Sequence, residues 1–299
     1  MFEFNIKVAM RIYLVFLAAI LVINGFNTPQ ASCQNIAGMS VGELVDRLPA
    51  ENSADQDDVI SRLVASGDEA ILFIINNLVA PGRGDDVKHR YALSGIVKYV
   101  GQGDDPYRKI NISAALCKAL SSANDPEVKD FILQELQYIA GDEALLYVAP
   151  YLSDKRLADP AARVLVNIGS AHAGGALLHF LSRSEGEASI KIIQAIGELG
   201  YSPAAPQIRQ FVLSDDPALR AVAFHTLASI GDIESAGVLF DAAKSAGYDY
   251  EQTRATSSWL LLLENMIRSG NKPLADKMIY EAINSGKVPV HTIIALMKL

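Results

Sequence analysis

Apolar residues recur along this chain with the spacing of one face of an α-helix. In two segments, 219–230 and 128–139, they occupy the same offsets. These positions are Leu219, Val222, Ala223, Leu227 and Ile230 in one segment, and Val128, Phe131, Ile132, Leu136 and Ile139 in the other. Because spacings of i, i+3 and i+4 fall on one helical face, the pattern predicts amphipathic helices that each bury one side.

Glycines close these helical patterns at a regular interval. Gly169, Gly200 and Gly231 follow one another at 31 residues, and Gly141 lies 28 residues before Gly169. Weaker members at longer intervals are Gly67, Gly101 and Gly270. A second apolar helical pattern follows each glycine, and the tetrapeptide Gly-Asp-Glu-Ala occurs both at Gly67 and at Gly141. An internal repeat of this length is typical of stacked helical hairpins.

The residues at the helix ends have a physical reason. Asp125-Pro126 and Asp216-Pro217 each place a side-chain acceptor before a proline in the first helical turn, where the missing N–H costs nothing. The closing glycine suits the left-handed conformation that follows many helices. Further acidic pairs, at 57–58, 85–86, 104–105 and 215–216, are expected to cap helix starts and not to hold calcium.

One of these segments carries a family resemblance. From Asp216 it reads Asp-Pro-Ala-Leu-Arg-Ala-Val-Ala-Phe-His-Thr-Leu-Ala-Ser-Ile-Gly-Asp-Ile-Glu-Ser-Ala. This resembles the short bacterial HEAT repeat, the repeat of the PBS-lyase type, strongly over 122–245 and moderately over 55–121 and 251–285. Arg220 matches the arginine that braces adjacent repeats in that family. Pro160 lies either at a helix kink of the kind HEAT helices show, or at the start of its helix.

The resemblance implies an all-α fold, a right-handed α-α superhelix (a HEAT/armadillo-like solenoid) of about seven helical hairpins. The hairpins are expected at 55–81, 86–121, 125–152, 154–184, 186–214, 216–245 and 251–286. A last apolar helix, 289–299, has no visible partner. It either folds back over the seventh hairpin or belongs to a chain shortened relative to a longer relative.

The N-terminus reads as an export signal. Lys7 and Arg11 precede an almost unbroken apolar run at 13–23, which has the length of a signal-peptide core. Small residues before Cys33 suggest lipidation of that cysteine, while ordinary cleavage near 31–37 and an uncleaved anchor are alternatives. The expected organisation is a signal peptide or anchor (1–32), a linker or N-terminal cap (33–54) and the repeat domain (55–299). The expected location is the periplasm, the cell envelope or the secreted space, with membrane contact only through the N-terminal segment.

Net charge bears on nucleic-acid binding, and the cysteine count bears on disulfide bonds. The formal net charge is −8 and there is no Lys/Arg cluster, so nucleic-acid binding is not expected. Two cysteines do not make a disulfide framework, and Cys117 is predicted to be a small buried hydrophobe.

Candidate catalytic chemistry is sparse. The five histidines form no metal-binding motif, and neither a C-x-x-C pair nor a Gly-x-Ser-x-Gly elbow is present in the sequence. His172 and His179 lie two helical turns apart, but the turn after Gly169 is expected to leave His172 outside the helix. We therefore expect no catalytic residue, no metal and no cofactor.

Binding residues are predicted from helical phase. A solenoid offers a groove lined by its second helices. The polar candidates there are Glu143, Gln207, Arg209, Glu234 and Asp241. A second group, Tyr248, Tyr250 and Arg254, lies at an irregular junction between hairpins six and seven. These aromatics form either a recognition surface or a plug for the junction, and Trp259 is expected in the core.

These features favour a non-catalytic protein–protein interaction scaffold. The alternatives are an accessory or regulatory repeat module of an exported enzyme system, or a lyase-like HEAT enzyme. The protein partner is not identified by the sequence.

Overall fold

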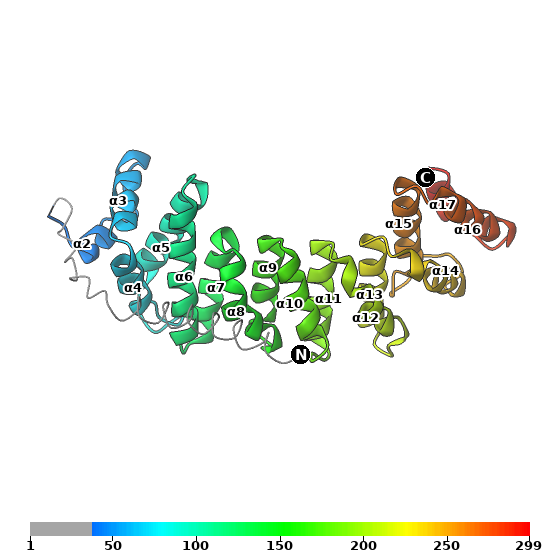
Figure 1. Ribbon diagram of the computed structural model, residues 1–299, viewed down its shortest axis with the longest axis horizontal. Coiled ribbons are helices and arrows are strands. Elements are labelled where there is room, and N and C mark those ends of the chain that lie inside the picture. The colour runs from blue at the N-terminus through cyan, green and yellow to red at the C-terminus, as the bar shows by residue number, and fades with distance from the viewer. Residues whose placement is uncertain (1–37) are drawn as a thin grey trace, which may run out of the picture. The chain divides into compact units, whose positions relative to one another are not determined.

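The structure, a computed structural model, describes residues 38–299, and within this range it contains helices and no β-strand (Figure 1). Residues Val41–Leu299 form one compact unit. The prediction of an all-α solenoid is therefore confirmed, while its right-handed winding and the domain boundaries stay predictions. The predicted signal peptide or anchor lies outside the described residues.

Each expected hairpin is present as a first helix followed by an antiparallel second element. The first helices are α3 (Ser53–Ala65), α5 (Val87–Gln102), α7 (Pro126–Ile139), α9 (Ala158–Ile168), α11 (Glu187–Leu199), α13 (Pro217–Ser229) and α15 (Ala255–Arg268). The second elements are α4 (Asp68–Asn76), α6 (Pro106–Ser122), η1-α8-η2 (Asp142–Ala144, Leu145–Val148, Ala149–Ser153), α10 (Ala171–Leu181), η3-α12-η4 (Ser202–Ala204, Ala205–Ile208, Arg209–Leu213), η5-α14 (Ile233–Ser235, Ala236–Ser245) and α16 (Lys272–Asn284).

The core runs through the stacked first helices. Each of α5, α7, α9, α11, α13 and α15 packs against the first helix before it. The periodic residues Leu219, Ala223 and Leu227 of α13 are buried, as the pattern predicts. Since a single hairpin leaves this face open, the neighbouring repeats supply the cover.

Side chains also tie consecutive first helices together through backbone carbonyls. Thr226 of α13 donates its hydroxyl to the carbonyl of Ile193 in α11, at 3.1 Å, from a buried position. Two asparagines do the same elsewhere: Asn167 to Gln137 O at 3.1 Å and Asn265 to Ala228 O at 2.8 Å. These bonds fix the register of one repeat on the next.

The helix ends follow the predicted chemistry at the regular repeats. Gly169, Gly200 and Gly231 all have positive φ, between +69° and +71°. Asp125 and Asp216 cap α7 and α13 by accepting backbone N–H groups at 2.9 and 2.8 Å. The three glycines that share the 31-residue spacing therefore have the same conformation.

Of the weaker glycines, Gly270 shares this role, with φ +86° directly after the C-cap residue of α15, whereas the others depart from it. Gly141 has φ −116°, and the residue that ends α7 is Ala140. Gly101 lies inside α5, and Gly67 precedes α4 as its N-cap residue. Pro160 stands in the first turn of α9, so it belongs to the start of that helix and not to a kink. His172 lies inside α10, although it was expected outside the helix.

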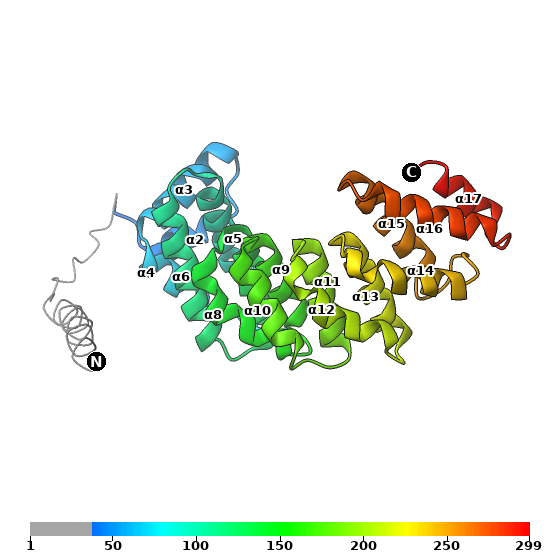
Figure 2. The same ribbon diagram turned by 45° about the vertical axis from the view of Figure 1, so that its right-hand side comes forward.

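Two short helices lie at the ends of the unit (Figures 1 and 2). Helix α2 (Val41–Asp46), in the stretch predicted as linker or cap, packs against α3, α4 and α5. Helix α17 (Val290–Leu296) folds back onto the loop before α15, where the Thr292 hydroxyl donates to the carbonyl of Tyr248 at 2.7 Å. The contact shown is with the loop between hairpins six and seven, and whether the chain is shortened relative to a longer relative stays a prediction.

Candidate binding surfaces

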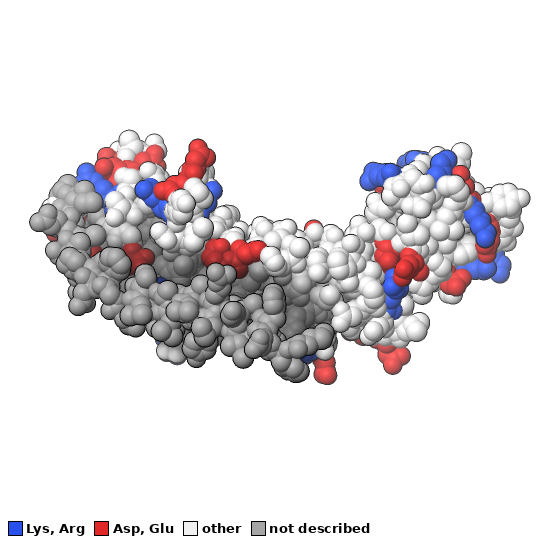
Figure 3. Space-filling view, in the orientation of Figure 1, with Lys and Arg blue, Asp and Glu red and all other residues white. Residues whose placement is uncertain are grey.

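The α-helical segments of the second elements of hairpins three to five are uncharged, whereas their 3-10 segments carry Asp142, Glu143 and Arg209. The sequences of α8 (LLYV), α10 (AHAGGALLHFL) and α12 (APQI) contain no Asp, Glu, Lys or Arg. In Figure 3, the surface between α11 and α13, around α12, is almost free of charged side chains. In a chain with 20% charged residues, three consecutive neutral helices make a distinct surface.

The outward-facing residues of these second elements can be located from a buried alanine near the start of each element. A fully buried alanine stands near the start of each second element: Ala144, Ala173 and Ala204. The residues two and three positions later are exposed or half-buried, and we call them the second-helix face: Leu146, Tyr147, Gly175, Ala176, Pro206 and Gln207. Leu146 is 87% exposed, although a leucine gains most from burial. The second-helix face is therefore a candidate interaction surface.

Glu143, at the edge of this face, has a structural role. Its Oε1 accepts hydrogen bonds from the Ser113 hydroxyl at 2.7 Å and from the Gly141 N–H at 2.9 Å. The carboxylate therefore joins hairpins two and three. The prediction that Glu143 is free for a partner is only half met, because one of its oxygens is already occupied.

Arg209 and Glu234 form part of one ion-pair network. Arg209 contacts Asp232 at 2.6 Å and Glu234 at 2.7 Å, so it joins hairpins five and six. The hydrogen bond that Arg209 donates to Asp232 raises the pKa of its guanidinium. These two predicted groove residues are thus brought together, but as a tie between repeats. Asp241 is exposed on α14, and whether it binds a partner stays a prediction.

The aromatic junction is a plug, which corrects the placement of Tyr248 among binding residues. Tyr248 is 1% exposed and packs between Phe240 and Trp259, at ring-centroid distances of 6.2 and 5.7 Å. Burial raises the pKa of its phenol. The irregular loop leaves a gap between hairpins six and seven, and burying this ring fills it.

The other two junction residues remain on the surface. Tyr250 is exposed and stacks on His291 with ring centroids 5.1 Å apart. Arg254 is exposed, has φ +56° and precedes α15. The structure therefore separates these two residues from Tyr248.

A groove lies between two first helices, α11 and α13, and the predicted groove along the second helices stays a prediction. It holds about 540 Å³ between α11 and α13 and reaches the loop before α15. Small and apolar residues form its floor, and polar ones form its rim. The floor is Ile190, Ala218, Ala221 and Val222, and the rim includes Gln194, Glu198, His225, Ser229 and Arg254. Among the predicted residues, Arg254 lines this first-helix groove.

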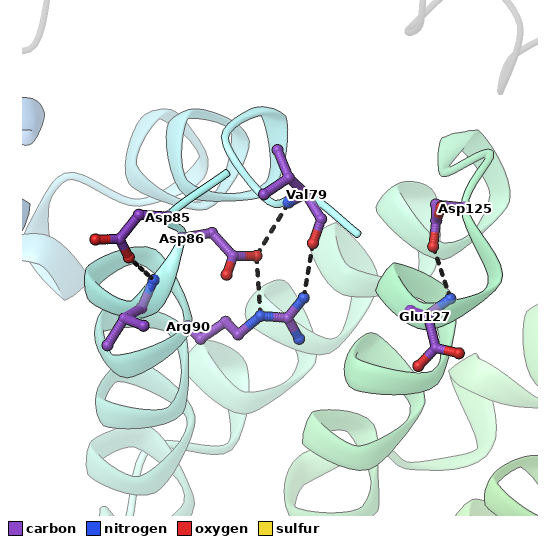
Figure 4. Close-up of polar contacts among 7 residues, drawn as sticks. Val79, Asp85, Asp86, Arg90, Asp125 and Glu127 are labelled. Carbon is purple, nitrogen blue, oxygen red and sulfur yellow. Dashed lines mark hydrogen bonds and ion pairs between the residues drawn. The ribbon is translucent and has the colours of Figure 1, made fainter. Parts of the chain in front are cut away.

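Three of the four acidic pairs lie at helix starts, as expected, whereas Asp57 and Asp58 lie inside α3. Asp85 accepts the Val87 N–H at the start of α5, at 3.1 Å (Figure 4). Asp86 accepts from the Val79 N–H at 3.0 Å and from Arg90 at 2.9 Å, and Arg90 also donates to the Val79 carbonyl. Burial alone would raise the pKa of Asp86, but these hydrogen bonds outweigh it and lower the pKa. The hydrogen bonds that join Asp86, Arg90 and Val79 in Figure 4 therefore have a structural role.

Two buried titratable groups lie inside the stack. Glu135 of α7 accepts a hydrogen bond from Ser94 of α5 at 2.5 Å, and desolvation by burial raises its pKa despite that bond. Cys117 is buried, as predicted, and burial raises its thiol pKa to about 12. Both groups are enclosed by neighbouring repeats.

Two searches concern the described residues only. Residues 38–299 hold no group of three or more His, Cys, Asp or Glu side chains placed to bind a metal. None of the helices in that range is both long and apolar enough to cross a membrane. Cys33, the predicted lipidation site, lies outside the described residues.

Comparison with known proteins identifies the repeat. Residues 174–258 match the family model described as HEAT repeats, so this part of the chain consists of HEAT repeats. No curated protein matches the chain. Among solved structures, the crystal structure of an engineered protein from a structural genomics consortium is 22% identical. That alignment covers 78% of this chain and 98% of the engineered protein, with a TM-score of 0.29.

Proposed function

We propose that this chain of HEAT repeats is a non-catalytic scaffold that binds another protein through its second-helix face. HEAT repeats generally mediate protein–protein interaction, and the observation that carries the proposal is the row of neutral second helices with Leu146 exposed at its edge. Neutral, partly apolar surfaces lose little on desolvation when a partner covers them. Export to the cell envelope or the secreted space, with Cys33 as a possible lipid anchor, is part of the same proposal. Its support is the N-terminal sequence pattern.

Photo-crosslinking at single positions tests the proposal and separates two surfaces. A photoreactive residue is placed at Ala176 or Gln207 on the second-helix face, or at Arg163 or His225 on first helices, and the full chain is irradiated in envelope extract. We expect one discrete protein adduct from the second-helix positions and none from the first-helix positions.

The matched variants are Leu146→Asp and Val87→Asp, which both place a carboxylate at an exposed apolar position. Leu146→Asp is expected to reduce the adduct at least tenfold, because a buried carboxylate at a contact is costly, while Val87→Asp leaves it unchanged. An adduct that forms only from the first-helix positions would assign binding to the groove between α11 and α13. An adduct insensitive to Leu146→Asp would also contradict the proposal.

A further inference from the structure

The last helix carries an apolar stripe that the rest of the described chain leaves uncovered. Val290 and Ile294 lie four residues apart on α17, and Met297 follows as its C-cap residue; the three are 73%, 50% and 80% exposed. The opposite side of α17 is fixed, since Thr292 and Leu296 are buried there. The stripe is therefore held facing solvent by the packing of the other side of the same helix.

Charge at this end differs from charge in the rest of the chain. Residues 269–299 hold four Lys and two Asp or Glu, a formal charge of +2, whereas the remainder of the chain carries −10. Both acids are already paired: Asp276 with Lys272 at 3.2 Å and Glu281 with Lys244 at 3.5 Å. The other three lysines, Lys277, Lys287 and Lys298, make no ion pair among the described residues. In Figure 3, Lys and Arg side chains lie over the end that carries α15, α16 and α17, with Asp and Glu side chains between them.

We propose that this end of the repeat unit docks on an anionic lipid surface. The apolar stripe enters the boundary between headgroups and acyl chains, and the three unpaired lysines contact the acidic headgroups. Helix α17 itself contains no lysine: Lys277 lies on α16, Lys287 in the loop before α17 and Lys298 after its end. Their long stems allow the charges to stay in the headgroup layer while apolar side chains enter more deeply. Tyr280 on α16 is 71% exposed and has the amphipathic ring favoured at such a boundary. The contact adds to the one expected at the N-terminal segment and is independent of the proposed partner face.

A local probe tests this without interference from other parts of the chain. The full chain with Cys33→Ser and Met297→Cys is labelled at residue 297 with an environment-sensitive fluorophore, because Cys117 is buried. Vesicles contain phosphatidylglycerol and phosphatidylcholine, or phosphatidylcholine alone. We expect a blue shift with the anionic vesicles only, weakening as salt is raised. The probe reports its own surroundings, so binding by the N-terminal segment produces no shift.

Two matched pairs of variants distinguish the stripe and its lysines from general effects. The triple variant Lys277→Glu, Lys287→Glu and Lys298→Glu is compared with Lys98→Glu, Lys118→Glu and Lys155→Glu, which has the same net charge. Val290→Asp is compared with Val87→Asp; both are exposed valines at the first position of a helix, where Asp favours the helix. We expect at least tenfold weaker vesicle binding for the first member of each pair and no change for the second.

Equal losses in both triples, or a shift independent of lipid charge, would overturn the proposal. A blue shift that appears without vesicles and rises with protein concentration would also overturn it. That result, with a larger mass in sedimentation velocity, would make the stripe an interface between two copies of the chain.

Discussion

Adjacent glycines in α10 should respond oppositely to the same substitution. Gly174 is buried, and a Cβ built there would lie 2.3–2.7 Å from ring atoms of Tyr201 in the following hairpin. A Cβ at Gly175 would meet only the Tyr201 hydroxyl, at 3.9 Å. The two positions share a helix and a residue type, so the contact with Tyr201 is what separates them.

The magnitude follows from two opposing effects. Alanine favours a helix interior over glycine by about 1 kcal/mol, and this gain applies at both positions. At Gly174 the crowded atoms belong to the inner part of the ring, so α10 or Tyr201 must shift, which costs about 1–3 kcal/mol. Gly175→Ala should therefore gain about 1 kcal/mol over the parent chain, and Gly174→Ala should fall about 1–3 kcal/mol below Gly175→Ala.

Urea unfolding followed by circular dichroism at 222 nm measures the difference. The reasoning is checked by combining each substitution with Tyr201→Ala, which removes the ring together with its Cγ. We expect the penalty of Gly174→Ala to disappear in that background, while the gain of Gly175→Ala remains. If Gly174→Ala proves as stable as Gly175→Ala, or keeps its penalty without the ring, the close approach of Tyr201 to α10 is not what requires glycine.

Three further predictions concern groups within the stack. Burial raises the folded-state pKa of Glu135, so the stability of the folded chain falls as the pH rises above the unfolded-state pKa. Glu135→Gln should therefore be more stable than wild type at pH 7, and this gain should vanish below about pH 4. Urea unfolding at each pH measures both. In a Cys33→Ser background, Cys117 should resist Ellman's reagent at pH 8 until urea unfolds the chain, and labelling in the native state would contradict its burial. Arg209→Ala should cost about 1 kcal/mol by thermal unfolding, and the surface-pair control Arg163→Ala less than about 0.5 kcal/mol; equal losses would remove the case for a tie between repeats.

The first helices could be predicted from sequence because their rules are local. In α13, for example, Asp216 marks the start of the helix, Gly231 marks its end, and the apolar residues between them mark the buried side. The irregular second elements were not predicted, although a cause is visible in the sequence. Pro150 opens η2 and Pro203 lies in η3, and a proline lacks the N–H that a continuous α-helix would use. Two second elements therefore divide into short α and 3-10 segments.

The surface could be predicted less well, because pairing partners come from different repeats. Helical phase places Arg209 on an outward side, but Asp232 occupies it from 23 residues away. Phase equally places Tyr248 at a junction without saying that Phe240 and Trp259 close over it. A polar residue on a solenoid is thus a poor guide to binding, since many polar side chains form hydrogen bonds or ion pairs with the neighbouring repeat.

The neutral face suggests a better rule for this type of chain. Residues such as Leu146 make no ion pair or hydrogen bond that stacking could consume, and their exposure costs hydration of apolar surface. Stability alone gives no reason to keep three successive second helices uncharged, since surface charges there would aid solubility. For α8, α10 and α12, the missing charge is therefore a stronger sign of a partner than any single polar side chain. It places the test at Leu146 and not at Arg209.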